Sequence, residues 1–125
     1  MKNDKDALTD DFDANIERFL SDAIATGCVW ALESDEGFAV CPSVSNEDID
    51  VMPLWSQPEY AAEHCHDEWQ SYKAVPIALD ELLEDWLPGM HSDVVLVGPN
   101  WNADMEGAEV EPLDLLEEID REAAE

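Results

Sequence analysis

The stretch VPIALDELLEDWLPGMHSDVVLVG, residues 75–98, joins two segments typical of β-strands through one segment typical of a helix. Residues 72–78 predict the first strand, and Pro88-Gly89 predicts the end of the helix that follows it. Residues 93–98 predict a second strand, which we expect to be deeply buried because its apolar run is rich in β-branched side chains. The helix between them is predicted from apolar residues at the spacing of one helical face, namely Leu79, Leu82, Leu83, Trp86 and Leu87.

Upstream of this stretch, the sequence predicts a β-hairpin and a further strand. Residues 28–33 are typical of a strand, 34–37 of a tight turn, and 38–41 of the returning strand. Residues 51–55 predict a short third strand. We expect this strand to lie at a sheet edge, because Pro53 cannot donate a hydrogen bond to a neighbouring strand.

Three more helices are predicted, and together the elements indicate the fold class. A helix capped by Thr9 or Asp10 is predicted to end at Thr26-Gly27. A second helix is predicted over 57–68 behind a capping-box pattern, and a last one begins at Pro112 after a brief strand at 108–110. Hairpins mixed with crossovers favour an α+β fold, with a mixed or antiparallel sheet of about five strands and about four helices. We expect a frayed N-terminus over 1–8 and one compact domain over 9–125.

Three segments of the chain share a family resemblance. They are VWALESDEGFAV at 29–40, MPLWSQPEYAAEHCHDEW at 52–69 and VPIALDELLEDWLPGM at 75–90. In this combination the region 29–102 resembles a bacterial family known as domain of unknown function 2750. The resemblance implies a compact α+β unit of acidic character, and it supplies no catalytic residue to carry over to this chain.

The strongest compositional signal is negative charge. The chain has 32 Asp and Glu residues against 5 Lys and Arg, a formal net charge of −27. Such a chain repels nucleic acid and anionic membranes, which argues against binding nucleic acid through a basic patch. The charge is compatible with adaptation to high salt or with binding of a basic partner. A special case of the latter is an acidic protein that mimics DNA and inhibits a nucleic-acid-binding protein.

Targeting signals and cysteine chemistry give a plain expectation. No apolar run is long enough to span a membrane, and the polar, acidic N-terminus does not resemble a signal peptide, so we expect a cytoplasmic protein that does not contact a membrane. The three cysteines, Cys28, Cys41 and Cys65, form no CxxC pair. We therefore expect buried free thiols rather than disulfides or a zinc site.

Candidate catalytic and metal-binding groups do not form a recognisable site. His64 and His66 flank Cys65, but residues two apart lie on different sides of a helix, whereas ligands on one helix are normally three or four residues apart. Adjacent cysteine and histidine side chains also point apart, which argues against a catalytic pair. The acids between Asp80 and Asp85 are typical of a solvated helix face. The loop 45–50 lacks the pattern of a calcium-binding loop. We therefore expect no metal and no cofactor.

Tryptophans are the remaining candidates for a binding role. Trp30, Trp69 and Trp86 are predicted to lie in the core. Trp101 and Trp55 are candidate anchors for a partner protein, since exposed tryptophans often dominate interfaces. The alternative for Trp101 is that it packs beneath its own loop. The sequence thus predicts a non-catalytic protein-binding or regulatory module whose partner is a protein, with a basic protein as one candidate. A DNA-mimic inhibitor and a small hydrolase or metal-dependent enzyme are the alternatives.

Overall fold

The computed structural model describes residues 11–35, 37–43, 48–62, 71–102 and 107–124, and it confirms the predicted α+β class. The helical segments in this part of the chain are α1 (Phe12–Thr26), α2 (Pro58–Ala62), α3 (Leu79–Glu81), a π-helical turn (Leu82–Trp86), α4 (Leu87–Asp93) and α5 (Pro112–Ala124). The strands are β1 (Cys28–Ser34), β2 (Gly37–Phe38), β3 (Cys41–Pro42), β4 (Asp50–Leu54), β5 (Lys73–Ala78) and β6 (Leu96–Pro99).

The strands form two small sheets rather than the single sheet that was predicted. In the described residues, one antiparallel sheet has the order β2-β1-β5, and a mixed sheet has the order β3-β4-β6 with β4 and β6 parallel. The predicted edge position of β4 is therefore wrong, since β4 lies between two strands. Pro53 is tolerated there because β3 pairs only with Asp50 and Val51, so next to Pro53 the strand is paired on one side alone.

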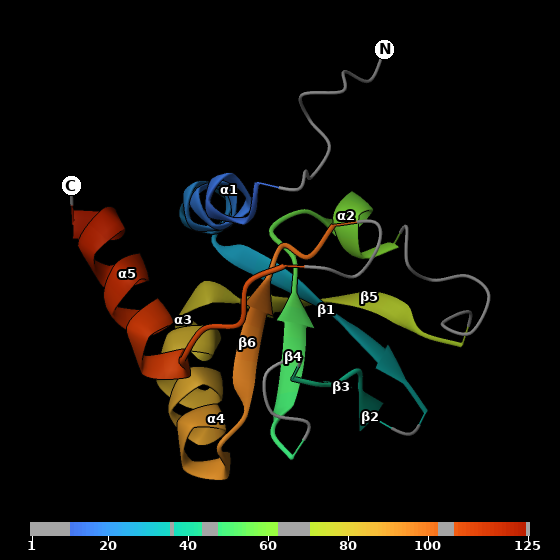
Figure 1. Cartoon of the computed structure of the whole chain (residues 1–125). Coiled ribbons are helices and arrows are strands. Elements are labelled where there is room, and N and C mark those ends of the chain that lie inside the picture. The colour runs from blue at the N-terminus through green and yellow to red at the C-terminus, as the bar shows by residue number, and fades with distance from the viewer. Residues whose placement is uncertain (1–10, 36, 44–47, 63–70, 103–106, 125) are drawn as a thin grey trace.

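Two tryptophan backbones join the sheets. Trp30 in β1 and Trp55, directly after β4, form an antiparallel bridge with N···O distances of 2.7 and 2.8 Å. The strands lie together on one side of the molecule, with α4 and α5 on the other side and α1 across one end (Figure 1). The larger apolar core fills the space between the helices and the sheets, and it includes fully buried Phe19, Leu82 and Ile119.

The first helix has its predicted C-terminal end, but its N-cap is Asp11 rather than Thr9 or Asp10. Asp11 caps its N-terminus by accepting a hydrogen bond from the Ala14 N–H at 3.1 Å. Gly27 adopts the left-handed conformation, with φ 73°, and its N–H donates to the Ala23 carbonyl. On its inner face Phe19 and Ala23 are fully inaccessible, whereas Phe12 in the first turn is 37% exposed. Helix α1 is thus fixed by local sequence signals at both ends and by the core along its length.

The predicted helix end at Pro88-Gly89 is wrong, because the helix continues to Asp93. The segment Leu82–Trp86 is a π-helical turn, in which the Leu87 N–H donates to the Leu82 carbonyl. Pro88 then lies in the first turn of α4, where a missing N–H costs least. Val94, the residue after Asp93, has φ 59° and caps the end of the helix. Strand β6 therefore begins at Leu96 and not at Asp93 as predicted.

The remaining predictions were met in part. Helix α2 covers the start of the predicted 57–68 helix, and residues 63–70 lie outside the described part. The predicted strand at 108–110 is reduced to one bridge between Val110 and Val97. Among the described residues, no helix combines the length and apolar composition required to cross a lipid bilayer.

Candidate functional site

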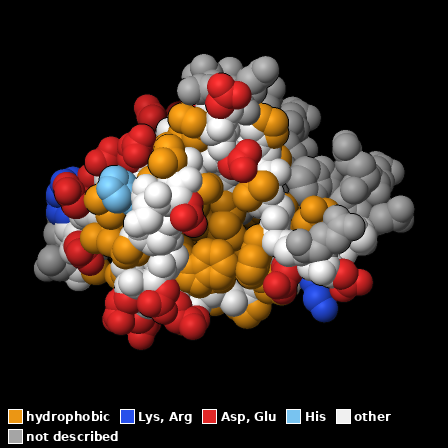
Figure 2. All heavy atoms as spheres, turned by 90° about the horizontal axis from the view of Figure 1, so that it is seen from below, with side chains coloured by type: hydrophobic (Ala, Val, Ile, Leu, Met, Phe, Trp, Pro, Cys, Tyr) orange, Lys and Arg blue, Asp and Glu red, His pale blue; other side chains and the backbone are white. Residues whose placement is uncertain are grey.

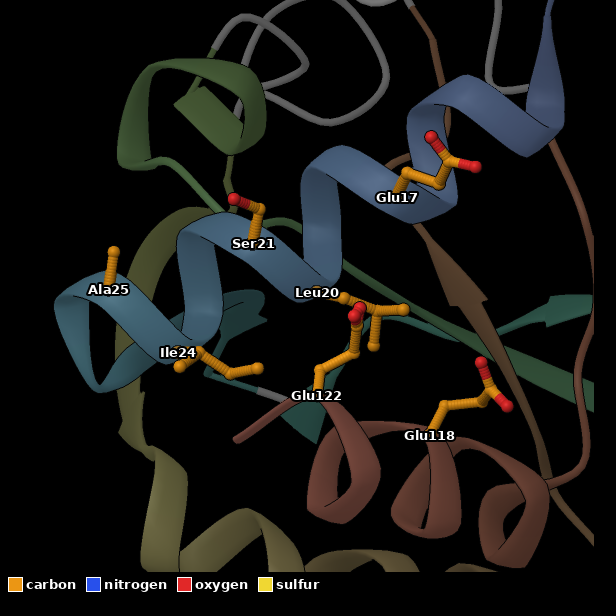
Figure 3. A pocket seen from close by; sticks show the side chains of 7 residues that line it. All are labelled: Glu17, Leu20, Ser21, Ile24, Ala25, Glu118 and Glu122. Carbon is orange, nitrogen blue, oxygen red and sulfur yellow. The ribbon is translucent and has the colours of Figure 1, made fainter. Parts of the chain in front are cut away.

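A groove that shows both apolar and charged side chains lies between α1 and α5 (Figure 3). Its volume is about 480 Å³. The residues that line it are Glu17, Leu20, Ser21, Ile24 and Ala25 from α1 and Glu118 and Glu122 from α5. Segments almost a hundred residues apart in the sequence therefore form the two walls of one groove.

Helical periodicity explains why these side chains share the groove. On α1, Leu20 and Ile24 are four residues apart and lie on the side that faces α5, while Glu118 and Glu122 are four residues apart on α5 and point toward α1 (Figure 3). Leu20 is only 6% exposed and belongs to the core. Ile24 is half-buried at the margin of the same core, so these two side chains give the groove an apolar floor.

The walls of the groove carry negative charge. Glu17 and Glu122 are exposed, and within the described part of the chain neither has a cationic partner. Glu118 accepts a hydrogen bond from Arg121, one turn further along α5. The nearest basic residue on α1, Arg18, does not line the groove and instead donates to the Tyr60 hydroxyl at 2.9 Å. The groove thus combines an apolar floor with carboxylates.

A buried polar network holds α1 in its position beside the sheets. Asn100, fully buried after β6, donates to the Asn15 carbonyl at 3.2 Å and to the Ser56 hydroxyl at 2.9 Å, and it accepts from the Ser56 N–H at 2.8 Å. Ser56 in turn donates to the Asp22 carboxylate at 3.0 Å. Helix α1 therefore has two hydrogen-bonded links to the ends of β4 and β6.

The two tryptophans predicted as partner anchors are buried in the structure. Trp55 is 0% and Trp101 5% exposed, so neither presents its ring to a partner, and this prediction is corrected. The Trp55 indole N–H donates to the Trp101 carbonyl at 2.9 Å, and the Trp101 indole N–H donates to the Ala108 carbonyl at 2.9 Å. Trp101 packs beneath its own loop, which was the alternative prediction for this residue.

Glycines make room for the Trp101 indole. A Cβ atom at Gly98 or at Gly107 would overlap with the ring. The indole is thus enclosed by two segments that can approach it closely because each has a glycine at the point of contact. The sequence gives no direct signal of this enclosure, since the glycines lie on either side of the tryptophan and not in a recognised motif.

Other candidate residues are placed as follows. His64, Cys65 and His66 lie outside the described residues, as does the first half of the 45–50 loop. The acids Asp80, Glu81, Glu84 and Asp85 are exposed on their helix, as predicted. In the part of the chain that the structure describes, no group of three or more His, Cys, Asp or Glu side chains is arranged to hold a metal ion.

The two described cysteines are free and half-buried rather than fully buried. Burial raises the pKa of the Cys28 thiol above its ordinary value, and a backbone hydrogen bond with Ile77 partly opposes this. Burial also raises the pKa of the Cys41 thiol, and the negative charge of Asp50 raises it further. Both thiols are therefore weak nucleophiles at neutral pH, since the thiolate is the reactive form.

Sequence reasoning missed the α1–α5 groove. Each of its residues is typical of an ordinary amphipathic helix, and only the packing of α1 on α5 brings the two sets of side chains together. Trp86 and Trp30, predicted to lie in the core, are half-buried and pack against its margins, and Trp69 lies outside the described residues. The only available signal was the placement of glutamates beside apolar residues at four-residue spacing on both helices.

Comparison with known protein families gives a match over most of the chain. A family model described as "Protein of unknown function (DUF2750)" matches residues 16–119. This range contains the region 29–102 on which the resemblance was based, and it extends over all of the described strands and most of α1 and α5. No curated protein matches the chain.

Proposed function

The chain belongs to the DUF2750 family of proteins of unknown function, and we propose that it is a non-catalytic module that binds a basic partner protein in the groove between α1 and α5. One observation carries this proposal: the groove has an apolar floor, carboxylates on both walls and no basic side chain lining it. A partner segment with this complementarity carries apolar side chains toward the floor and Lys or Arg side chains toward the walls.

The dimensions of the groove suit such a segment. Its volume of about 480 Å³ lies within the roughly 300–1,000 Å³ of typical ligand-binding pockets. A groove between two helices commonly accepts an amphipathic helix, whose apolar side chains occupy positions three and four residues apart. Burial of Ile24 and of the exposed edge of Leu20 would contribute to affinity, while Glu17, Glu118 and Glu122 would orient the segment.

The charge of the whole molecule supports rapid association with a basic partner. A surface of one sign raises the association rate with an oppositely charged protein, and this rate falls as ionic strength rises. The apolar contacts are much less sensitive to salt. We therefore expect a specific partner to associate more slowly at high salt but to remain bound, in contrast to proteins held by charge alone.

The experiment compares matched variants of one helix. The variant Glu118→Gln/Glu122→Gln removes two carboxylates from the groove, and Glu117→Gln/Asp120→Asn removes two exposed carboxylates of α5 that do not line it. Each tagged protein is incubated with its native lysate at about 0.1 M and about 0.5 M salt, and captured proteins are quantified by mass spectrometry.

We expect one stoichiometric partner to survive both washes with the wild type and the control variant, and to be reduced at least about tenfold with the groove variant. Addition of duplex DNA as a competitor tests whether the bound surface of the partner also binds nucleic acid, as a DNA mimic requires. Equal losses in both variants, or binding that disappears at high salt, would contradict the proposal, because either result indicates attraction by net charge alone.

A further inference from the structure

A second pocket lies at the opposite end of the helical layer from α1. It is shallow, with a volume of about 250 Å³, and Asp85, Trp86, Gly89, Met90 and Asp93 line it. It shares no residue with the α1–α5 groove. Seen from the end of the molecule where α4 lies, apolar side chains surround a hollow, and Asp and Glu side chains gather along its margins (Figure 2).

Trp86 gives the pocket a rigid aromatic wall. Its ring packs edge-to-face on Phe38, with centroids 4.9 Å apart and planes at 86°. This arrangement is favourable for aromatic pairs and fixes the orientation of the indole. Because Trp86 is only half-buried, part of its ring stays accessible to a ligand. A π-helical turn ends at Trp86, and such turns are frequent at functional sites.

Gly89 keeps the pocket open without any structural need for glycine. Its φ is not positive, and a Cβ atom added there would meet no other atom within 4 Å. Glycine inside a helix is less stable than alanine, because it loses more backbone freedom on folding. Glycine at this position therefore leaves one side of the pocket without a side chain, at a cost in helix stability.

The lining groups have the chemistry of a site for one cationic side chain. The indole face attracts a cation through its quadrupole, and an arginine guanidinium can also stack on it. Met90 offers an apolar surface to the methylene groups of such a side chain. Asp85 and Asp93 are exposed carboxylates, and no basic residue lines the pocket in the described part of the chain.

We propose that this pocket binds a single arginine side chain of a partner protein, stacked on Trp86 with its guanidinium between Asp85 and Asp93. A second copy of this chain is a poor occupant, since two molecules of net charge −27 repel each other. A neutral apolar ligand would bury the carboxylates without satisfying them. Arginine satisfies the ring and the carboxylates together, and its planar fork suits carboxylates better than lysine does.

The experiment uses protein labelled with 5-fluorotryptophan and short peptides as probes. The ¹⁹F resonance of Trp86 is identified by its loss in Trp86→Phe. The protein is titrated with acetyl-Gly-Arg-Gly-amide and with the matched lysine and citrulline peptides, citrulline being the neutral counterpart of arginine. We expect a saturable shift of the Trp86 resonance with the arginine peptide, a weaker effect with lysine and none with citrulline.

Variants test the individual groups. We expect Asp85→Asn/Asp93→Asn to lower the affinity for the arginine peptide at least about tenfold. The matched control Asp80→Asn/Glu81→Gln removes two exposed carboxylates outside the pocket, and we expect its affinity to stay within about twofold of the wild type. Gly89→Ala should raise thermal stability and still weaken binding, which a purely structural glycine would not do. The groove variant Glu118→Gln/Glu122→Gln should bind the peptide normally, so failure here is distinct from failure of the proposed groove.

Several results would overturn this inference. These are the absence of a Trp86 shift with the arginine peptide, an equal response to citrulline or lysine, an equal loss in the Asp80→Asn/Glu81→Gln control, and normal binding by Gly89→Ala.

Discussion

At the scale of single residues, the environment of Cys41 makes a prediction about reactivity. Its pKa is raised first by burial and then by the negative charge of Asp50, which disfavours the thiolate. Removing that charge by Asp50→Asn should lower the pKa of Cys41 and so increase its thiolate fraction at a pH below the pKa. We expect alkylation of Cys41 by iodoacetamide at pH 8 to become roughly two- to fivefold faster.

Cys28 is an internal control for this experiment. Its pKa is raised by burial, without a contribution from Asp50, so its alkylation rate should not change in Asp50→Asn. Both rates can be followed in one sample by mass spectrometry of the proteolytic peptides. Equal acceleration of Cys28 and Cys41 would indicate loosening of the fold instead of the loss of one local charge.

Val94 adopts a left-handed backbone conformation that strains its side chain, and substitution can relieve this strain. It is 63% exposed and adopts φ 59° and ψ 50°, while the Val95 N–H donates to the Met90 carbonyl at 2.9 Å as in a glycine-terminated helix. A β-branched side chain is strained in this conformation. We expect Val94→Gly to raise the free energy of unfolding by about 1 kcal/mol, after allowance for the greater freedom of glycine in the unfolded chain.

Urea denaturation measures this change, and Ser92→Gly is the matched control. Ser92 is exposed within α4, so glycine there should lower the free energy of unfolding by about 0.5–1 kcal/mol. A loss of stability in both variants would show that Val94 is not strained.

Val94 also explains why the helix end was predicted wrongly. Sequence rules assign the end to Pro88-Gly89, and no rule selects valine for a left-handed position.

At the scale of elements, the Asn100 network determines how α1 meets the sheets. Asn100 has φ 50°, which asparagine tolerates better than most residues, and its side chain bonds to both Asn15 and Ser56. Asn100→Ala would leave the buried Ser56 N–H and Asn15 carbonyl without this partner. We expect the free energy of unfolding to fall by about 3 kcal/mol, with faster hydrogen exchange at the amides of α1.

Asn100→Gly separates the side-chain bonds from the backbone conformation. Glycine accepts the positive φ without strain but makes none of the side-chain hydrogen bonds. We expect it to destabilise nearly as much as alanine. If Asn100→Gly instead retained the stability of the wild type, the network would have no energetic role and the position of α1 would depend on apolar packing alone.

Elements with strong local signals were predicted well, and their partners were not. Gly27 identifies the C-terminal end of α1, and short apolar runs identify β1 and β5. The way in which the two sheets are joined depends instead on the bridge between Trp30 and Trp55, which are far apart in the chain and carry no pairing signal. The groove and the Trp86 pocket escaped prediction for the same reason, since each depends on which helix packs beside which strand or helix.

At the scale of the whole molecule, the part of the chain that the structure describes has its densest acids on the helical layer. Helix α5 and the segment 79–93 together contain ten Asp and Glu residues and one arginine. Composition alone predicts the charge but not this distribution, because helical periodicity places the acids outward and tertiary packing places the helices on one side (Figure 1). The same packing leaves the α1–α5 groove and the Trp86 pocket open to basic partners.

This crowding of like charges predicts that salt stabilises the fold. Repulsion between exposed carboxylates opposes the compact state, and salt screens this repulsion. The screening (Debye) length is about 3 Å at 1 M salt and about 10 Å at 0.1 M. We expect the free energy of unfolding, measured with urea, to rise by about 1–3 kcal/mol between about 0.05 and 1 M NaCl. The matched variant Asp114→Asn/Glu117→Gln/Asp120→Asn, altered at three exposed positions of α5 outside the groove, should be more stable than the wild type at low salt and less sensitive to added salt. An equal salt dependence in both proteins would mean that repulsion on the helical layer is too weak to matter, and that the acids act chiefly through the partners that they attract.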